Sequence, residues 1–222
     1  MTTEQIRDFL IDAILQGERE QANKLLDDQV ANSSYRKTME EILEPVLEEI
    51  GNMWNKEKIS LAQGYIAGKV AEDFLIKIRD SEAYDKLKEK RPVIMGNIED
   101  DFHSLGRKLV CTFLEVAGWQ VFDLGNDVTA KDFVDKAVET GARVIGVSAM
   151  MFTTAENIKK VRQEIDKRKL TGKIKLAVGG AVFRIRPELV GEIGGDGTAS
   201  NAPEAPKLFE ELWNKSLKEV PA

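Results

Sequence analysis

The sequence predicts an α/β protein in which an N-terminal four-helix bundle is followed by a parallel five-stranded sheet. Two observations support this prediction. Residues 4 to about 79 keep the apolar spacing of helices throughout, and from residue 92 short apolar runs alternate with amphipathic helical stretches. Such alternation is typical of a parallel sheet with helices on both faces. We expect a helical domain over 1–79, a charged linker over 80–91 and a sheet domain over 92–222.

Four apolar stripes define the helices of the first domain. Gly17 separates the first two stripes, Pro45 should kink the third helix, and Ser60 suits the N-cap of the fourth. The stripes contain Ile6, Leu10, Ala13 and Ile14; Ala22, Leu25, Leu26 and Val30; Met39, Ile42, Leu43, Val46, Leu47, Ile50, Met53 and Trp54; and Leu61, Tyr65, Ile66, Val70 and Phe74.

The second domain alternates between strands and helices. We expect strands at 93–95, 120–123, 144–147 and 175–178, with helices near 104–117, 130–140 and 155–169 between them. A fifth short strand is expected at 197–199, before a closing amphipathic helix over 203–217.

Composition narrows the class of function. The chain has 32 Lys and Arg against 38 Asp and Glu, and its charge of -6 argues against a general nucleic-acid binder. No run of about 18 apolar residues is present, and the segment from Met1 to Gln5 lacks the features of a signal peptide. We therefore expect a cytoplasmic protein. Cys111, the sole cysteine, lies among apolar helix positions and is expected to be a buried structural thiol.

The only histidine of the chain, His103, lies where the first strand should give way to a helix. Imidazole is a common metal ligand, and Asp101, two residues earlier, can accept the proton of its other nitrogen. Open α/β sheets bind ligands at the carboxyl ends of their strands. His103 is therefore a candidate metal ligand.

The other predicted strands also end in segments that suit a buried ligand. Asp123-Leu124-Gly125 forms a turn, Ser148 to Thr154 is small and rich in hydroxyls, and Gly179-Gly180 is a glycine pair followed by Ala181, Val182 and Phe183. Each segment also has an ordinary explanation, because such residues are common in tight turns and helix caps.

These segments share a family resemblance. Gly96 to Gly106 resembles the D-x-H-x-x-G signature of cobalamin-binding domains, and Ser148-Ala149-Met150 resembles their S-x-L motif with Met in place of Leu. Gly179-Gly180 resembles the glycine pair of the family, and Asp196 to Ala202 resembles its segment beside the nucleotide tail. The resemblance implies a Rossmann-like (flavodoxin-like) sheet domain. It also implies cobalamin held base-off, with His103 as its lower axial ligand and its tail in a slot of the domain.

The helical half adds a second resemblance. Ile50 to Gln63 is similar to the helical cap of corrinoid methyl-carrier proteins and of cobalamin-dependent methionine synthase. There an aromatic residue at the position of Trp54 and an aliphatic one at that of Leu61 cover the upper face of the corrin. The alternative is that Trp54 simply ends a core stripe.

The resemblance implies a carrier that moves methyl groups on cobalt between partner proteins, with no catalytic residue of its own. His103 would bind methyl-Co(III) and release Co(I), Asp101 would hydrogen-bond His103, and Thr154 would end the Asp-His-Ser relay of the family. The implied partners are a substrate-specific methyltransferase, an acceptor methyltransferase and a corrinoid-reactivating protein, with no nucleic acid or membrane. The implied cobalamin-binding residues are Trp54, Leu61, Asp101, Phe102, His103, Ser104, Leu105, Gly106, Leu124, Gly125, Ser148, Met150, Thr153, Thr154, Gly179, Gly180, Ala181, Val182, Phe183, Thr198, Ala199 and Ser200.

Three alternatives remain, of which an adenosylcobalamin mutase subunit is the least favoured because such subunits lack the helical cap. A cobalamin-based sensor would share the helical region, but such photoreceptors follow the Trp with a Glu-His pair where this chain has Gln63-Gly64. A flavodoxin-like domain without a corrinoid would leave His103 as a helix-capping residue. The chain also departs from the family pattern, with Asp100 where Gly is common and Arg107-Lys108 where Lys-Asn is common. The methyl donor cannot be read from these residues.

Overall fold

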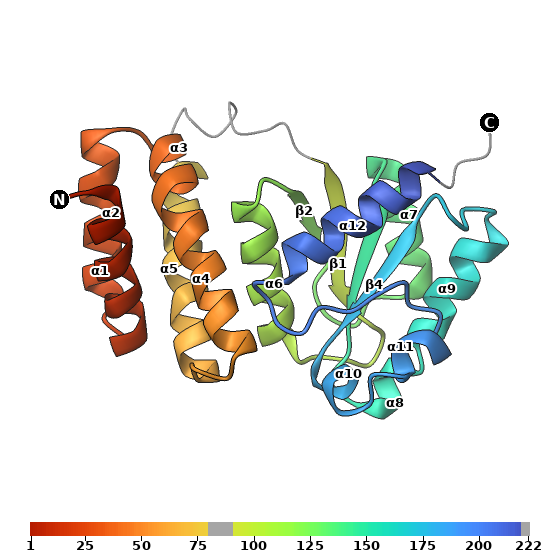
Figure 1. Ribbon diagram of the computed structural model, residues 1–222. Helices are drawn as coiled ribbons and strands as arrows, with labels where there is room; N and C mark the ends of the chain where they lie inside the picture. Colours follow the sequence, from red (N-terminus) through yellow and green to blue (C-terminus); the bar gives the residue numbers. More distant parts are fainter. Residues whose placement is uncertain (80–90, 219–222) are drawn as a thin grey trace. The chain divides into compact units, whose positions relative to one another are not determined.

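The computed structural model describes residues 1–79 and 91–218, which belong to an N-terminal helical unit and a C-terminal α/β unit (Figure 1). The predicted α/β class and the N-terminal helical region are confirmed. Apart from Arg91, the linker expected over 80–91 lies outside the described residues, so the domain boundaries stay a prediction.

The helices of the first unit begin and end at recognisable caps. Thr2 and Gln5 form a capping box at the start of α1, and Gly17, with φ +78°, ends that helix in the left-handed conformation that glycine favours. Ser60 Oγ accepts from the backbone N–H of Gln63 at 3.3 Å, which confirms the predicted N-cap of the last helix. The helices are α1 (Thr3–Gln16), α2 (Arg19–Asn32), α3 (Tyr35–Thr38), α4 (Glu44–Asn55) and α5 (Leu61–Arg79).

The helix type changes just before Pro45. The segment η1 (Met39–Leu43), between α3 and α4, is a π-helical turn, and the kink expected at Pro45 stays a prediction. Proline leaves the carbonyl four residues earlier, that of Glu41, without its helical donor. The Arg7 Nε of α1 donates to this oxygen at 2.8 Å, so the proline is accommodated by a contact between helices.

Four parallel strands form the sheet of the α/β unit, in the order β2-β1-β3-β4. The chain runs from β1 outward to β2 and then crosses to the other side of β1 for β3. The strand order therefore reverses between β1 and β3, which is where open α/β sheets bind their ligands. The strands are β1 (Pro92–Asn97), β2 (Gln120–Asp123), β3 (Val144–Ser148) and β4 (Lys175–Gly179).

Helices cover both faces of the sheet, and alternate strand residues divide between two cores (Figure 1). On one face, Val93 and Met95 of β1 pack with residues of α6 and α12. On the other, Ile94 packs with residues of α7 and α9. The helices of this unit are α6 (Ser104–Val116), α7 (Ala130–Thr140), α8 (Phe152–Ala155), α9 (Ile158–Lys167), α10 (Ala181–Ile185), α11 (Leu189–Glu192) and α12 (Ala205–Lys218).

The strand expected at 197–199 does not form in the described part of the chain, so the sheet has four strands there and not five. Gly197 makes one isolated bridge to Ala177 of β4. The backbone N–H of Leu176, which a further strand would use, donates instead to the carboxylate of Asp196 at 2.6 Å. Two backbone hydrogen bonds also join this segment to β4, from the Asp196 N–H to the Leu176 carbonyl at 2.7 Å and from the Val178 N–H to the Gly197 carbonyl at 2.9 Å.

Two further sequence features can be checked in the described residues. Cys111 is buried, as predicted. Across residues 1–79 and 91–218, no helix combines the length and the apolar character that a membrane span needs.

Candidate functional site

The carboxyl ends of three neighbouring strands bring the predicted site segments together. Asn97 of β1 pairs with Ser148 of β3, and Ser148 pairs with Gly179 of β4. His103 lies in the loop after Asn97, Thr154 lies in α8 after Ser148, and Gly180 follows Gly179 to complete the glycine pair. The site is therefore assembled at the reversal of strand order, with each segment contributed by a different strand.

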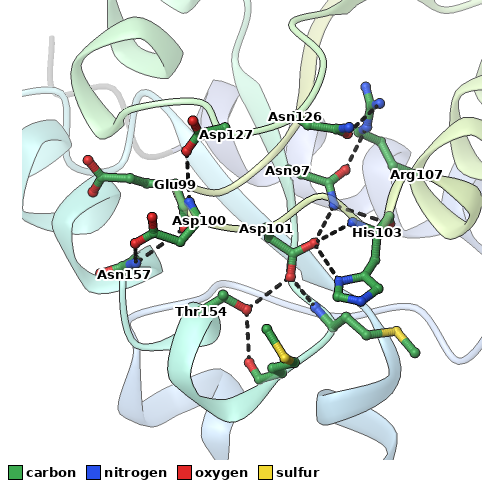
Figure 2. Close-up of polar contacts among 12 residues, drawn as sticks. Asn97, Glu99, Asp100, Asp101, His103, Arg107, Asn126, Asp127, Thr154 and Asn157 are labelled. Carbon is green, nitrogen blue, oxygen red and sulfur yellow. Dashed lines mark hydrogen bonds and ion pairs between the residues drawn. The ribbon is translucent and has the colours of Figure 1, made fainter.

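His103 and Asp101 lie side by side in the loop after β1, and they differ sharply in exposure. The Asp101 carboxylate is fully buried, whereas the imidazole is 49% exposed. His103 Nδ1 lies 3.4 Å from Asp101 Oδ1, and the backbone N–H of His103 donates to the same oxygen at 3.0 Å (Figure 2). An anchored carboxylate thus faces one nitrogen of a solvent-accessible imidazole.

The second oxygen of Asp101 joins this loop to the segment after β3. The backbone N–H of Met150 donates to Asp101 Oδ2 at 2.8 Å, and the Thr154 hydroxyl donates to it at 2.9 Å (Figure 2). Burial alone would raise the pKa of the Asp101 carboxyl. The hydrogen bonds outweigh burial and hold this pKa below its ordinary value, so the buried carboxylate stays ionised.

The backbone at Asp100 has a conformation that glycine adopts more readily than other residues. Its φ is +68°, in the left-handed region that aspartate tolerates better than most residues. Its backbone N–H donates to Asp127 Oδ1 at 2.9 Å, and Asn157 Nδ2 donates to the neighbouring Glu99 carbonyl at 3.2 Å. The loop before His103 is therefore braced from the α7 and α9 sides of the unit (Figure 2).

Two polar residues at the site were not among the predicted binding residues. Asn97 and Arg107 are both buried, and Arg107 Nε donates to Asn97 Oδ1 at 2.7 Å. Burial lowers the pKa of the Arg107 guanidinium, although arginine stays charged in proteins. A signal was present in the sequence: Asn97 ends an apolar strand, and Arg107 lies in the first turn of an amphipathic helix.

The two glycines after β4 have different surroundings. A Cβ added at Gly179 would meet nothing within 4 Å, so open space adjoins this position. A Cβ at Gly180, where φ is +124°, would lie 1.9 Å from the Ala149 carbonyl oxygen. Gly180 therefore packs backbone against backbone, and the room for a ligand is at Gly179.

Comparisons with known proteins match both units. Two family models, each described as a B12 binding domain, match residues 91–207 and 6–75. The dimethylamine corrinoid protein of Methanosarcina barkeri is 30% identical over 213 residues, which cover 96% of this chain and 99% of that protein.

The chain belongs to the B12-binding corrinoid protein family.

Solved structures agree with this assignment. The monomethylamine corrinoid protein of Methanosarcina barkeri is 27% identical, with a TM-score of 0.55, and the match covers 95% of this chain and 100% of that one. The methanol:cobalamin methyltransferase complex MtaBC from the same organism shares the fold at 21% identity, with a TM-score of 0.69 and coverage of 98% and 87%.

The remaining predicted residues of the corrinoid protein occupy distinct environments. Val182 and Phe183 lie in the core beneath the glycine pair, where they support the loop. Asp196 is held by Arg162 Nη2 at 2.5 Å, which anchors the segment that leads to Thr198, Ala199 and Ser200. The exposed members of the set are Phe102, Leu105, Gly106, Met150, Thr153, Gly180, Thr198 and Ser200, and the partly buried ones are Ser104, Leu124, Gly125, Ser148, Gly179, Ala181 and Ala199.

In the helical unit, Trp54 lies against Gly64 of α5. A Cβ added at Gly64 would come within 1.9 Å of Trp54 Cζ3. Gln63 caps α5 and donates from Nε2 to the Leu15 carbonyl at 3.0 Å. Within this unit, Gln63 therefore caps a helix and Gly64 leaves space for the indole of Trp54. Leu61, at the start of α5, is 62% exposed.

Proposed function

We propose that this corrinoid protein holds cobalamin base-off, with His103 as the lower ligand, and carries a methyl group between separate methyltransferases. The observation that supports the proposal most is the contact of His103 with Asp101, and of Asp101 with Thr154, at the reversal of strand order. Family membership supports the corrinoid.

The residues present fit such a group. His103 is the only histidine of the chain, so it offers one imidazole, which suits a metal whose other positions are filled by a macrocycle. Its ring is half exposed and therefore accessible from the outside of the loop. The open space at Gly179 supports a slot for a bulky tail, with Ser148 on the neighbouring strand. Residues 198–200 stay a proposal for the rim of this slot.

The corrinoid would supply a cobalt atom that accepts a methyl group and passes it on. Asp101 Oδ1, 3.4 Å from His103 Nδ1, is placed to accept a proton from that nitrogen, which would leave Nε2 with its lone pair for a metal. The Thr154 hydroxyl has one proton and two acceptors within reach, Asp101 Oδ2 at 2.9 Å and the Met151 carbonyl at 3.1 Å. If His103 were released from a metal, its Nε2 would be free to take up a proton, Asp101 would face the resulting imidazolium, and the Thr154 hydroxyl could bond to either acceptor.

The helical unit would act as a cap. In this proposal it is a four-helix bundle that presents Trp54 and Leu61 to the upper face of the corrin and moves aside for each partner. The partners are a substrate-specific methyltransferase, an acceptor methyltransferase and a corrinoid-reactivating protein. A cytoplasmic location stays a prediction from the sequence.

The visible spectrum of the reconstituted protein tests the ligand. Wild-type protein, His103→Ala and the control Lys108→Ala, which alters an exposed side chain on the same helix, are loaded with cobalamin. We expect wild type and Lys108→Ala to share a base-off, His-on spectrum that His103→Ala lacks. Coincident spectra of wild type and His103→Ala would show that His103 is not the ligand.

Methyl transfer is tested separately. Reduced, loaded protein is incubated with labelled dimethylamine and a dimethylamine methyltransferase, and then with labelled methanol and its methyltransferase. We expect label on the bound corrinoid with at least one of the two pairs. A corrinoid that binds and reduces normally yet accepts label from neither pair would count against a carrier for these donor classes.

A further inference from the structure

Arg107, in the first turn of α6, buries its guanidinium beside three oxygen atoms, and Figure 2 shows those of Asn97 and Asn126. Its Nε donates to Asn97 Oδ1 at 2.7 Å, its Nη2 donates to Asn126 Oδ1 at 3.2 Å, and its Nη1 pairs with Asp123. The side chain is only 3% exposed, so a full positive charge lies inside the fold, close to the loop of His103. A buried cation needs such partners, and one of them, Asn97, also contacts Asp101.

Arg107 determines which way the amide of Asn97 faces. A guanidinium has donors and no acceptor, so the atom of Asn97 next to Nε must be the carbonyl oxygen. The amide nitrogen then faces the other way and donates to Asp101 Oδ1 at 2.7 Å and to the His103 carbonyl oxygen at 3.2 Å. Because Asn97 is fully buried, its amide cannot turn out to solvent.

Asp101 Oδ1 consequently has three donors around it, and the imidazole is the most distant. Asn97 Nδ2 lies at 2.7 Å, the backbone nitrogen of His103 at 3.0 Å and the imidazole Nδ1 at 3.4 Å. One carboxylate oxygen has about two lone-pair directions, so a third donor is held weakly. The long contact between His103 and Asp101 follows from this competition.

We infer that Arg107, acting through Asn97, draws the charge of Asp101 away from His103 and thereby weakens the bond that His103 gives to a metal. An imidazole donates more strongly to a metal when its other N–H is bonded to a carboxylate. Both the nearby cation and the amide that it orients reduce this effect. Arg107 and Asn97 are therefore positioning residues, and the inference rests on the proposed role of His103.

Two readouts on the full chain test the inference, one of them without any cofactor. The variants are Arg107→Met, Arg107→Lys, and Arg168→Met as a control, because Arg168 is also an arginine paired with an aspartate, Asp135, and it lies at the C-terminal end of α9. In the apoprotein, nitrogen-15 NMR of the sole histidine reports how often Nδ1 carries the proton. In the cobalamin-loaded protein, the visible spectrum reports the ratio of His-on to His-off forms at a pH where half of the wild type is His-off.

Arg107→Met should raise the share of protonated Nδ1 and shift the ratio about three- to tenfold toward His-on, the range expected for one redirected hydrogen bond. Arg107→Lys keeps the positive charge but lacks the planar guanidinium with its several N–H donors, so it should give a smaller shift in the same direction. This variant also allows the test to be made if Arg107→Met does not fold. Arg168→Met should change neither readout.

An unchanged or opposite response of the two Arg107 variants, or an equal response of Arg168→Met, would overturn the inference. If His103→Ala leaves the wild-type spectrum unchanged, the ligand role of His103 fails instead. The apoprotein measurement then still shows whether Arg107 controls the pairing of Asp101 with His103.

Discussion

Replacing Gly64 with alanine tests how Trp54 is held in the helical unit. The added Cβ would lie 1.9 Å from Trp54 Cζ3, and ordinary contacts begin at 3.4 Å, so the indole must retreat by about 1.5 Å (3.4 minus 1.9). Overpacking of this kind costs roughly 1–3 kcal/mol, while alanine gains about 1 kcal/mol over glycine inside a helix. We expect a net destabilisation of about 1 kcal/mol.

The sign of the change should depend on Trp54. In a Trp54→Ala background the obstacle is absent, so Gly64→Ala should stabilise the unit by up to about 1 kcal/mol. The assay is urea unfolding of the wild type, both single variants and the double variant, followed by circular dichroism. Ala62→Gly, at an exposed position of α5, serves as the control and should cost about the same in both backgrounds. Equal stabilisation by Gly64→Ala with and without Trp54 would refute the packing of the indole on Gly64.

Two more outcomes follow from the structure. Gly180→Ala should destabilise the apoprotein by about 3 kcal/mol, because of the positive φ at this position and the nearby Ala149 carbonyl. Gly179→Ala should change the stability by no more than about 0.5 kcal/mol but should weaken cobalamin binding. Thermal unfolding and titration with cobalamin measure these effects, and equal losses of stability in the two variants would contradict the distinction. The hydrogen bond from Arg19 holds the pKa of Asp73 below its ordinary 3.8, so ionised Asp73 stabilises the fold above that value and stops doing so as the pH falls through its lower folded pKa. The gap in urea midpoint between wild type and Asp73→Asn should therefore be present near pH 6 and close toward pH 3, and a constant gap would count against the ion pair.

Periodicity was sufficient to predict most of the fold. Four strands and the helices between them follow from apolar spacing, and the breaks at Gly17 and Ser60 follow from local capping chemistry. Two features depended on contacts that spacing does not encode. The π-helical turn before Pro45 is accompanied by a donor from α1, and the segment at 197–199 makes an isolated bridge to β4 next to the side-chain hydrogen bond of Asp196.

The residues of the candidate site also fall into two groups, those predicted from local sequence patterns and those that depend on contacts between elements. His103, Asp101 and Thr154 were identified because they belong to short sequence patterns at predicted strand ends. Asn97 and Arg107 were not, because their importance comes from one hydrogen bond between a strand end and a helix ten residues later. A buried polar residue in an apolar run is a signal that such a bond exists, but the sequence does not say with which partner.

The loop of His103 shows why a candidate ligand is easier to identify in the sequence than its geometry is to predict. Asp100 has a left-handed backbone, which costs about 1–2 kcal/mol for a residue other than glycine. Its backbone N–H is bonded to Asp127, and Asp101 beside it is bonded to the segment after β3. The orientation of the imidazole therefore depends on three strand ends at once, each set by its own stretch of sequence. A change in any one of these segments can move His103 without altering the motif that identifies it.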